Sequence, residues 1–166
     1  MPVDRCCIDI SIEYAAWEDP SLCAPYAHWE AFFESITLHV LKNIPDTSPT
    51  ATEQHLSILL TDNETIQRLN QQFRGKDKPT NVLSFPPHDS LIPDHQTLGD
   101  LAFSFDVIKD EAAKDHKSFL NHMTHLPIHG ILPLQGYDHI QDEEAEEMEN
   151  LEIDLLSTLN IPNPYS

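Results

Sequence analysis

The stretch that decides the fold is HGILPLQGYDH, residues 129–139. Its apolar residues suit a helix, and Gly136 is the kind of residue that ends a helix in the left-handed conformation. The chain then reverses, so that His139 can return toward the helix face that carries His129. A zinc site of this kind uses histidines at i, i+4 and i+10, because residues four apart share one helix face. This chain has the first and the last, whereas Pro133 occupies the middle position.

Pro133 has two expected consequences. It removes a ligand and leaves two protein nitrogens where a catalytic zinc ion generally has three. Inside a helix it also removes the hydrogen bond to the carbonyl of His129, at a cost of about 3 kcal/mol. Pro127 adds a second break of the same kind. We therefore expect this helix to be kinked or interrupted and the metal affinity to be lower than that of a three-histidine site.

The flanking sequence favours an α+β fold, a small mixed sheet of about four strands covered by helices with the 118–135 helix near its middle. Alternating apolar residues predict strands, and apolar residues at helical spacing predict amphipathic helices. A capping-box pattern at Thr61 and Glu64 predicts a helix start, and Asp106 is a plausible cap of the next helix. Strands are expected at 6–14, 55–60, 80–85 and 98–105, and helices at 26–41, 61–74, 106–114, 118–135 and 142–159.

Length and composition predict a single domain over residues 1–166 with a core of its own. No apolar run approaches the roughly 18 residues of a membrane span, and the first residues lack a secretion signal, so a cytoplasmic protein is expected. The three cysteines are expected to be reduced thiols. The net charge of −19 is unusual for a nucleic-acid binder. However, four of the nine Lys and Arg residues lie between Arg68 and Lys78, which could form a local strip for phosphates.

Three blocks of sequence carry a family resemblance. They are HGILPLQGYDH at 129–139, RGKDKPTNVLSFP at 74–86, and EEAEEMENLE at 143–152 followed by Asn163-Pro164-Tyr165. In order and spacing they resemble the YbeY family, from about residue 55 onward. The family signature reads HGxLHLxGYDH, so Pro133 stands where the family has its second metal-binding histidine.

The resemblance implies a single-strand-specific, metal-dependent endoribonuclease that acts in rRNA maturation of the small ribosomal subunit and in ribosome quality control. It implies one zinc ion held by His129 and His139. It makes Arg74 the active-site arginine, where a guanidinium can clamp a phosphate and stabilise its developing charge. Lys76 and Lys78 become candidates for RNA binding. The expected partner is rRNA in the small subunit, and neither DNA nor a membrane is expected.

Several residues keep two interpretations. His125 lies four residues before His129 and could replace the missing ligand, but Pro127 lies between them, so we favour a structural or cleft-lining role for His125 and His122. The run EEAEEME is expected to be a solvated helix face, and His88 and His95 are expected in an exposed loop.

The function also keeps alternatives. The first is a ribosome-biogenesis binding factor with the same fold and impaired chemistry, and a weaker one is a hydrolase of another small substrate. A metalloprotease is disfavoured because Gly130 stands where such enzymes carry their glutamate base.

Overall fold

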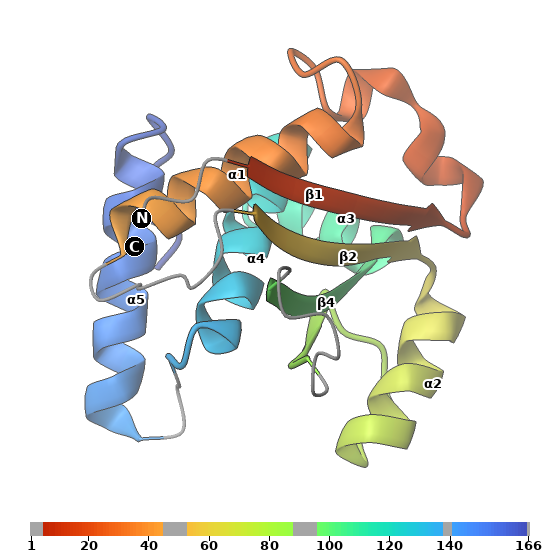
Figure 1. Cartoon of the computed structure of the whole chain (residues 1–166). Coiled ribbons are helices and arrows are strands. Elements are labelled where there is room, and N and C mark those ends of the chain that lie inside the picture. The colour runs from red at the N-terminus through yellow and green to blue at the C-terminus, as the bar shows by residue number, and fades with distance from the viewer. Residues whose placement is uncertain (1–4, 45–52, 88–95, 138–140, 166) are drawn as a thin grey trace.

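The computed structural model describes residues 5–44, 53–87, 96–137 and 141–165. Within these ranges four strands form one mixed sheet in the order β1-β2-β4-β3, with β1, β2 and β4 parallel and β3 antiparallel to β4. This confirms the expected α+β class (Figure 1). The strands are β1 (Arg5–Ile12), β2 (Glu53–Thr61), β3 (Val82–Phe85) and β4 (Gln96–Ser104); the helices are α1 (Trp29–Asn43), α2 (Asn63–Arg74), α3 (Phe105–Lys114), α4 (Phe119–Leu134) and α5 (Asp142–Ser157), with short 3-10 helices at Ala15–Glu18 and Pro20–Leu22.

The two faces of the sheet pack differently, because successive side chains of a strand point to opposite faces. Along β4, Leu101 and Phe103 belong to the main core, to which α1 and α4 also contribute. Ala102 belongs instead to a smaller cluster with Leu83 of β3 and Ile66 of α2. Helices α1 and α4 therefore cover one face, and α2 packs on the other.

Helix α4 lies at the centre of the fold, in contact with α1, α3, α5, β3 and β4. It runs without a break through Pro127 and Pro133, so the expected interruption is wrong. Each proline costs about 3 kcal/mol, but each fully buried aliphatic side chain contributes about 1.5–3 kcal/mol. Burial of the helix against the core offsets the local penalty. Its fully buried apolar residues are Met123, Leu126, Ile128, Ile131 and Leu132.

The end of α4 confirms the role expected of Gly136. This glycine adopts a positive φ of 95°. Its N–H donates to the carbonyl of Pro133 at 3.1 Å, and the next N–H, that of Tyr137, donates to the carbonyl of Leu132 at 3.1 Å. These two bonds form a Schellman motif, which satisfies carbonyls that the helix end would otherwise leave without partners.

Gly130 lets α4 lie directly against the sheet. A Cβ atom at this position would lie 3.0 Å from Leu101 Cδ2 and 3.2 Å from Ser84 Oγ, closer than most such contacts allow. The Ser84 hydroxyl also donates a hydrogen bond to the Gly130 carbonyl at 2.8 Å. The residue next to His129 is therefore in contact with β3 and β4.

The starts of two helices differ from expectation. Asp62 caps α2 through a 2.9 Å hydrogen bond from the Thr65 N–H, because Thr61 is the last paired residue of β2. Helix α3 begins at Phe105, so Asp106 lies in its first turn rather than capping it. Cys6, Cys7 and Cys23 form no disulfide in the structure.

Candidate metal centre

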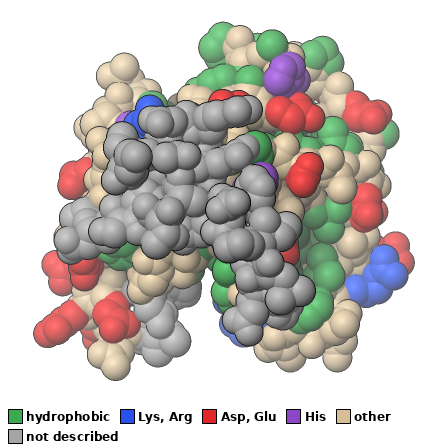
Figure 2. All heavy atoms as spheres, in the orientation of Figure 1, with side chains coloured by type: hydrophobic (Ala, Val, Ile, Leu, Met, Phe, Trp, Pro, Cys, Tyr) green, Lys and Arg blue, Asp and Glu red, His purple; other side chains and the backbone are tan. Residues whose placement is uncertain are grey.

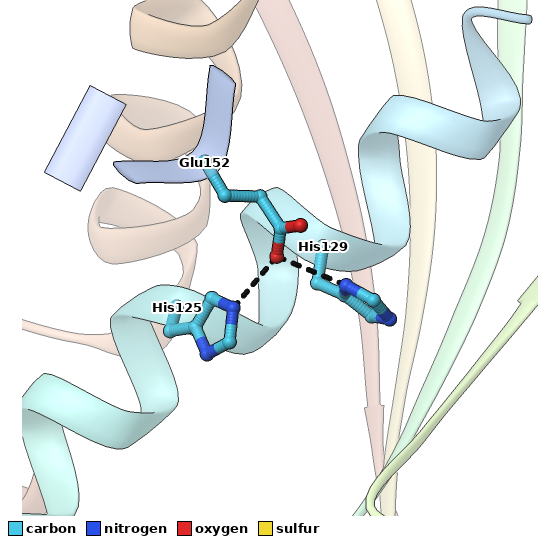
Figure 3. Close-up of side chains that lie close together, drawn as sticks. All are labelled: His125, His129 and Glu152. Carbon is cyan, nitrogen blue, oxygen red and sulfur yellow. Dashed lines mark hydrogen bonds and ion pairs between the residues drawn. The ribbon is translucent and has the colours of Figure 1, made fainter. Parts of the chain in front are cut away.

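Two histidines of α4 meet one carboxylate of α5. His125 and His129 are four residues apart and share a helix face, and Glu152 reaches them from α5 (Figure 3). Glu152 Oε1 lies 2.6 Å from His125 Nε2 and 2.9 Å from His129 Nδ1. One possible ligand atom from each residue lies within 4.8 Å of the others, so the group could hold a metal ion.

The three side chains differ in their access to solvent. Glu152 is fully buried, and the side chain of His125 is 11% exposed. The side chain of His129 is 34% exposed. Glu152 is therefore enclosed, and His129 is the most exposed of the three side chains.

Tyr165 completes the surroundings of Glu152. Its hydroxyl donates to both carboxylate oxygens, with each O–O distance 3.0 Å. Its ring meets the ring of His125 edge to face, with centroids 5.6 Å apart. Burial and the neighbouring Glu152 charge raise the pKa of the Tyr165 phenol, so it remains a hydrogen-bond donor at neutral pH.

The Glu152 carboxyl is ionised. Burial alone would raise its pKa, but the hydrogen bonds from His125 and His129 outweigh burial and lower the pKa to about 2. An ionised carboxylate only accepts hydrogen bonds. Glu152 is thus a buried anion that is surrounded by donors.

The distances show how an ion fits this group. Two ligands of one tetrahedral zinc ion, each about 2.1 Å from the metal, lie about 3.4 Å apart. The contacts of Glu152 with the two rings are shorter than that and have the lengths of hydrogen bonds. Glu152 holds Nδ1 of His129, and Figure 3 shows the other ring nitrogen pointing away from the carboxylate. Glu152 therefore holds the His129 ring by a hydrogen bond, and His129 Nε2 is the ring nitrogen that would be left to hold an ion.

The structure places some of the predicted site residues in this group and others elsewhere. His129 lies in it, and His125, for which a structural or cleft-lining role was favoured, is its second member. His139 lies outside the described residues, as do His88 and His95. Pro133 lies in the last turn of α4.

The basic candidates lie at another part of the molecule. Arg74 is the last residue of α2, and it is exposed, as are Lys76 and Lys78 in the segment that follows. The Lys78 carbonyl accepts a 2.9 Å hydrogen bond from Asn70 of α2, which holds this segment against the helix. Figure 1 places α2 and α5 on opposite sides of the molecule, so the basic segment and Glu152 come from separate regions.

His122, the third histidine of this face, has a partner of its own. Its Nε2 lies 2.9 Å from Glu111 Oε1, and the same oxygen accepts a 2.9 Å bond from Asn81 Nδ2. The Asn81 carbonyl in turn accepts the Ser104 N–H at 3.0 Å. This contact joins α3, α4 and the segment before β3, in agreement with a structural role for His122.

Glu152 and Tyr165 were not among the predicted site residues. The sequence does carry a signal for Glu152, because it lies four residues after Met148 and three before Leu155, both buried on the inner face of α5. A carboxylate in phase with an apolar stripe must be buried and needs partners. The carboxylates of EEAEEME, residues 143–149, are exposed, as expected. Figure 2 shows carboxylates over the lower left of the molecule, where α5 lies.

The fold and the buried group define a small α+β protein with a candidate metal site between two helices. The chain belongs to the YbeY family, whose model, described as endoribonuclease YbeY, matches residues 26–160. Across the described residues, no helix has the length and apolar character needed to cross a bilayer.

Individual relatives agree with this family. The chain is 50% identical over 113 residues to an endoribonuclease YbeY of Chelativorans sp., covering 67% of this chain and 69% of the relative. It is 40% identical over 163 residues to an endoribonuclease YbeY of Acinetobacter baylyi, covering 95% and 97%. Its fold is similar to the solution structure of a Thermotoga maritima protein, with a TM-score of 0.52, 26% identity and coverage of 92% and 91%. These relatives do not favour the binding-factor alternative.

Proposed function

We propose that this protein is a cytoplasmic, zinc-dependent endoribonuclease that cleaves single-stranded RNA during maturation and quality control of the small ribosomal subunit. Family membership supports the reaction class. The observation that carries the metal dependence is the His129 ring, which is held at Nδ1 by the buried Glu152 and belongs to a side chain that is 34% exposed. This is the arrangement by which proteins orient a metal-binding imidazole.

Each residue has a distinct part in the proposed reaction. His129 and His139 hold the ion, and the ion when bound supplies Lewis acidity and makes water a nucleophile at neutral pH. By the family resemblance Arg74 clamps a phosphate of the RNA, which would then extend from the group on α4 to the end of α2. Lys76 and Lys78 neutralise flanking phosphates.

The charge of the protein predicts how it meets RNA. The net charge is −19, and the basic segment at 74–78 holds three of the nine cations. Binding therefore depends on a few phosphate contacts, each of which releases counterions. We expect weak affinity that falls steeply as salt increases, and a requirement for unpaired RNA that can enter beside the metal site.

Pro133 distinguishes this site from the three-histidine form of the family signature. The helix is continuous at residue 133, so a histidine there would stand four residues after His129 on the same face. Pro133→His should therefore add a ligand without rebuilding the fold, and we expect zinc affinity to rise at least about tenfold.

The test is cleavage of a single-stranded RNA fragment by three proteins, each with and without a chelator. These are the unmodified chain, His129→Ala and Pro133→His, with the exposed Lys42→Ala as a control. We expect chelator-sensitive cleavage by the unmodified chain, none by His129→Ala, and no change with the control. Cleavage that survives both the chelator and His129→Ala would overturn the proposal. Cleavage by Pro133→His alone would favour the binding factor instead.

A further inference from the structure

Glu152 accepts hydrogen bonds from three side chains, which come from α4 and from the segment after α5. Oε1 receives His125, His129 and Tyr165, and Oε2 receives the Tyr165 hydroxyl again. The Tyr165 hydroxyl donates to both oxygens, so the carboxyl group is the acceptor in this arrangement. The two ring nitrogens that contact Oε1 then act as its donors.

Burial determines which ring nitrogen of His125 carries its hydrogen. Its Nε2 faces Glu152, whereas its Nδ1 is buried and has no hydrogen-bond partner among the described residues. A proton on Nδ1 would be a buried donor without an acceptor, at a cost of about 1–3 kcal/mol. The neutral ring with hydrogen on Nε2 avoids this cost and satisfies Glu152.

The ring nitrogen of His129 that faces Glu152 must also carry a hydrogen, but in this residue that nitrogen is Nδ1 rather than Nε2. The nitrogen that faces Glu152 is Nδ1, so this atom carries the hydrogen and Nε2 keeps its lone pair. A ring in this form keeps Nε2 as a possible ligand atom, and Figure 3 shows this nitrogen pointing away from the carboxylate. We infer that Glu152 is a positioning residue, which selects this tautomer of His129 and aims its Nε2 at the metal, while His125 and Tyr165 hold the carboxylate in place. The inference deepens the proposed function and rests on it for the identity of the ion.

Two variants test whether Glu152 orients the His129 ring or only stabilises the fold. Glu152→Gln keeps the size of the side chain but removes the charge, and Tyr165→Phe removes only a hydroxyl from a residue that is 44% exposed. Glu144→Gln makes the same chemical change at an exposed position of the same helix and serves as the matched control.

The first readout is the zinc dissociation constant, measured by competition with a chromophoric chelator. We expect it to rise about 10–100-fold in Glu152→Gln, to rise less in Tyr165→Phe, and to stay unchanged in the control. Equal zinc affinity in all four folded proteins would overturn the inference.

The second readout is the nitrogen NMR spectrum of the histidine rings, which reports the protonated nitrogen directly. Without metal, His129 in the unmodified chain should carry its hydrogen on Nδ1, and Glu152→Gln should shift it toward the Nε2 form that free histidine prefers. With zinc, the ligand atom should be Nε2. A hydrogen on Nε2 in the unmodified chain, or zinc on Nδ1, would overturn the inference. If the unmodified chain takes up no zinc, the metal proposal fails, and the spectrum without metal still decides the role of Glu152.

Discussion

Helix α4 makes two glutamate–histidine contacts that have different roles. Glu111 contacts His122, and Glu152 contacts His129, each with a nitrogen–oxygen distance of 2.9 Å. The side chain of His122 is 7% exposed and its Nδ1 is buried, whereas that of His129 is 34% exposed. A histidine can bind an ion or a substrate only if its second nitrogen is accessible, so the first contact joins helices and the second forms a candidate site.

The carboxylates differ in the opposite sense. Glu152 is fully buried, whereas the side chain of Glu111 is 39% exposed. The contact with the more buried acid is thus the one with the more open histidine. The two contacts therefore have the same nitrogen–oxygen distance but differ in burial, and His129 is the more exposed of the two histidines.

The sharpest test of this comparison replaces each histidine in turn. His129→Ala should weaken zinc binding by more than about 100-fold, because it removes a ligand rather than a group behind one. His122→Ala should leave zinc binding within about threefold, because its ring faces Glu111. Chelator competition on both folded variants measures the difference. Similar losses in the two variants would contradict the assignment of separate roles.

A smaller effect is expected at the structural contact. Glu111→Ala leaves the Nε2 of His122 and the Nδ2 of Asn81 without their acceptor. We expect the free energy of unfolding to fall by about 1–3 kcal/mol, as measured by urea denaturation. Asp110→Ala, at an exposed position beside it, should change stability by no more than about 0.5 kcal/mol.

The smallest effect is the pH dependence of that contact. Burial alone would raise the pKa of Glu111, but the hydrogen bonds from His122 and Asn81 outweigh it and lower the pKa. A carboxyl with a lowered pKa stabilises the fold above its ordinary pKa of about 4.3, and this contribution is lost as pH falls through the folded-state value. The stability difference between the unmodified chain and Glu111→Gln should therefore shrink between about pH 6 and pH 3. A difference that grows toward acid would show that the contact does not favour the ionised form.

Much of the fold could be predicted because its signals are local. The alternation of the strands, the apolar spacing of α1 and α4 and the glycine that ends α4 all lie within short windows of sequence. The uninterrupted course of α4 could not be predicted in this way. Pro127 and Pro133 oppose a helix locally, and only the surrounding core overcomes that preference.

The candidate site was predictable in part for a similar reason. The spacing within residues 129–139 identified His129, but the partner of its ring lies 23 residues further along the chain. Glu152 is one of eight carboxylates between Asp142 and Asp154, most of them solvated. Glu152 can be recognised as buried only because its helical spacing places it on the same face of α5 as Met148 and Leu155. Its contact with His129 depends on how α4 and α5 pack.

The close approach of Gly130 to the sheet has a consequence for the His129 ring beside it. Gly130 has no Cβ, so α4 lies directly against Leu101 and Ser84. These two side chains therefore set the distance between the sheet and the His129 ring. A bulkier residue on β3 or β4 would lift the whole helix and carry the ring with it. The position of the His129 ring thus depends on the side chains of β3 and β4 as well as on α4.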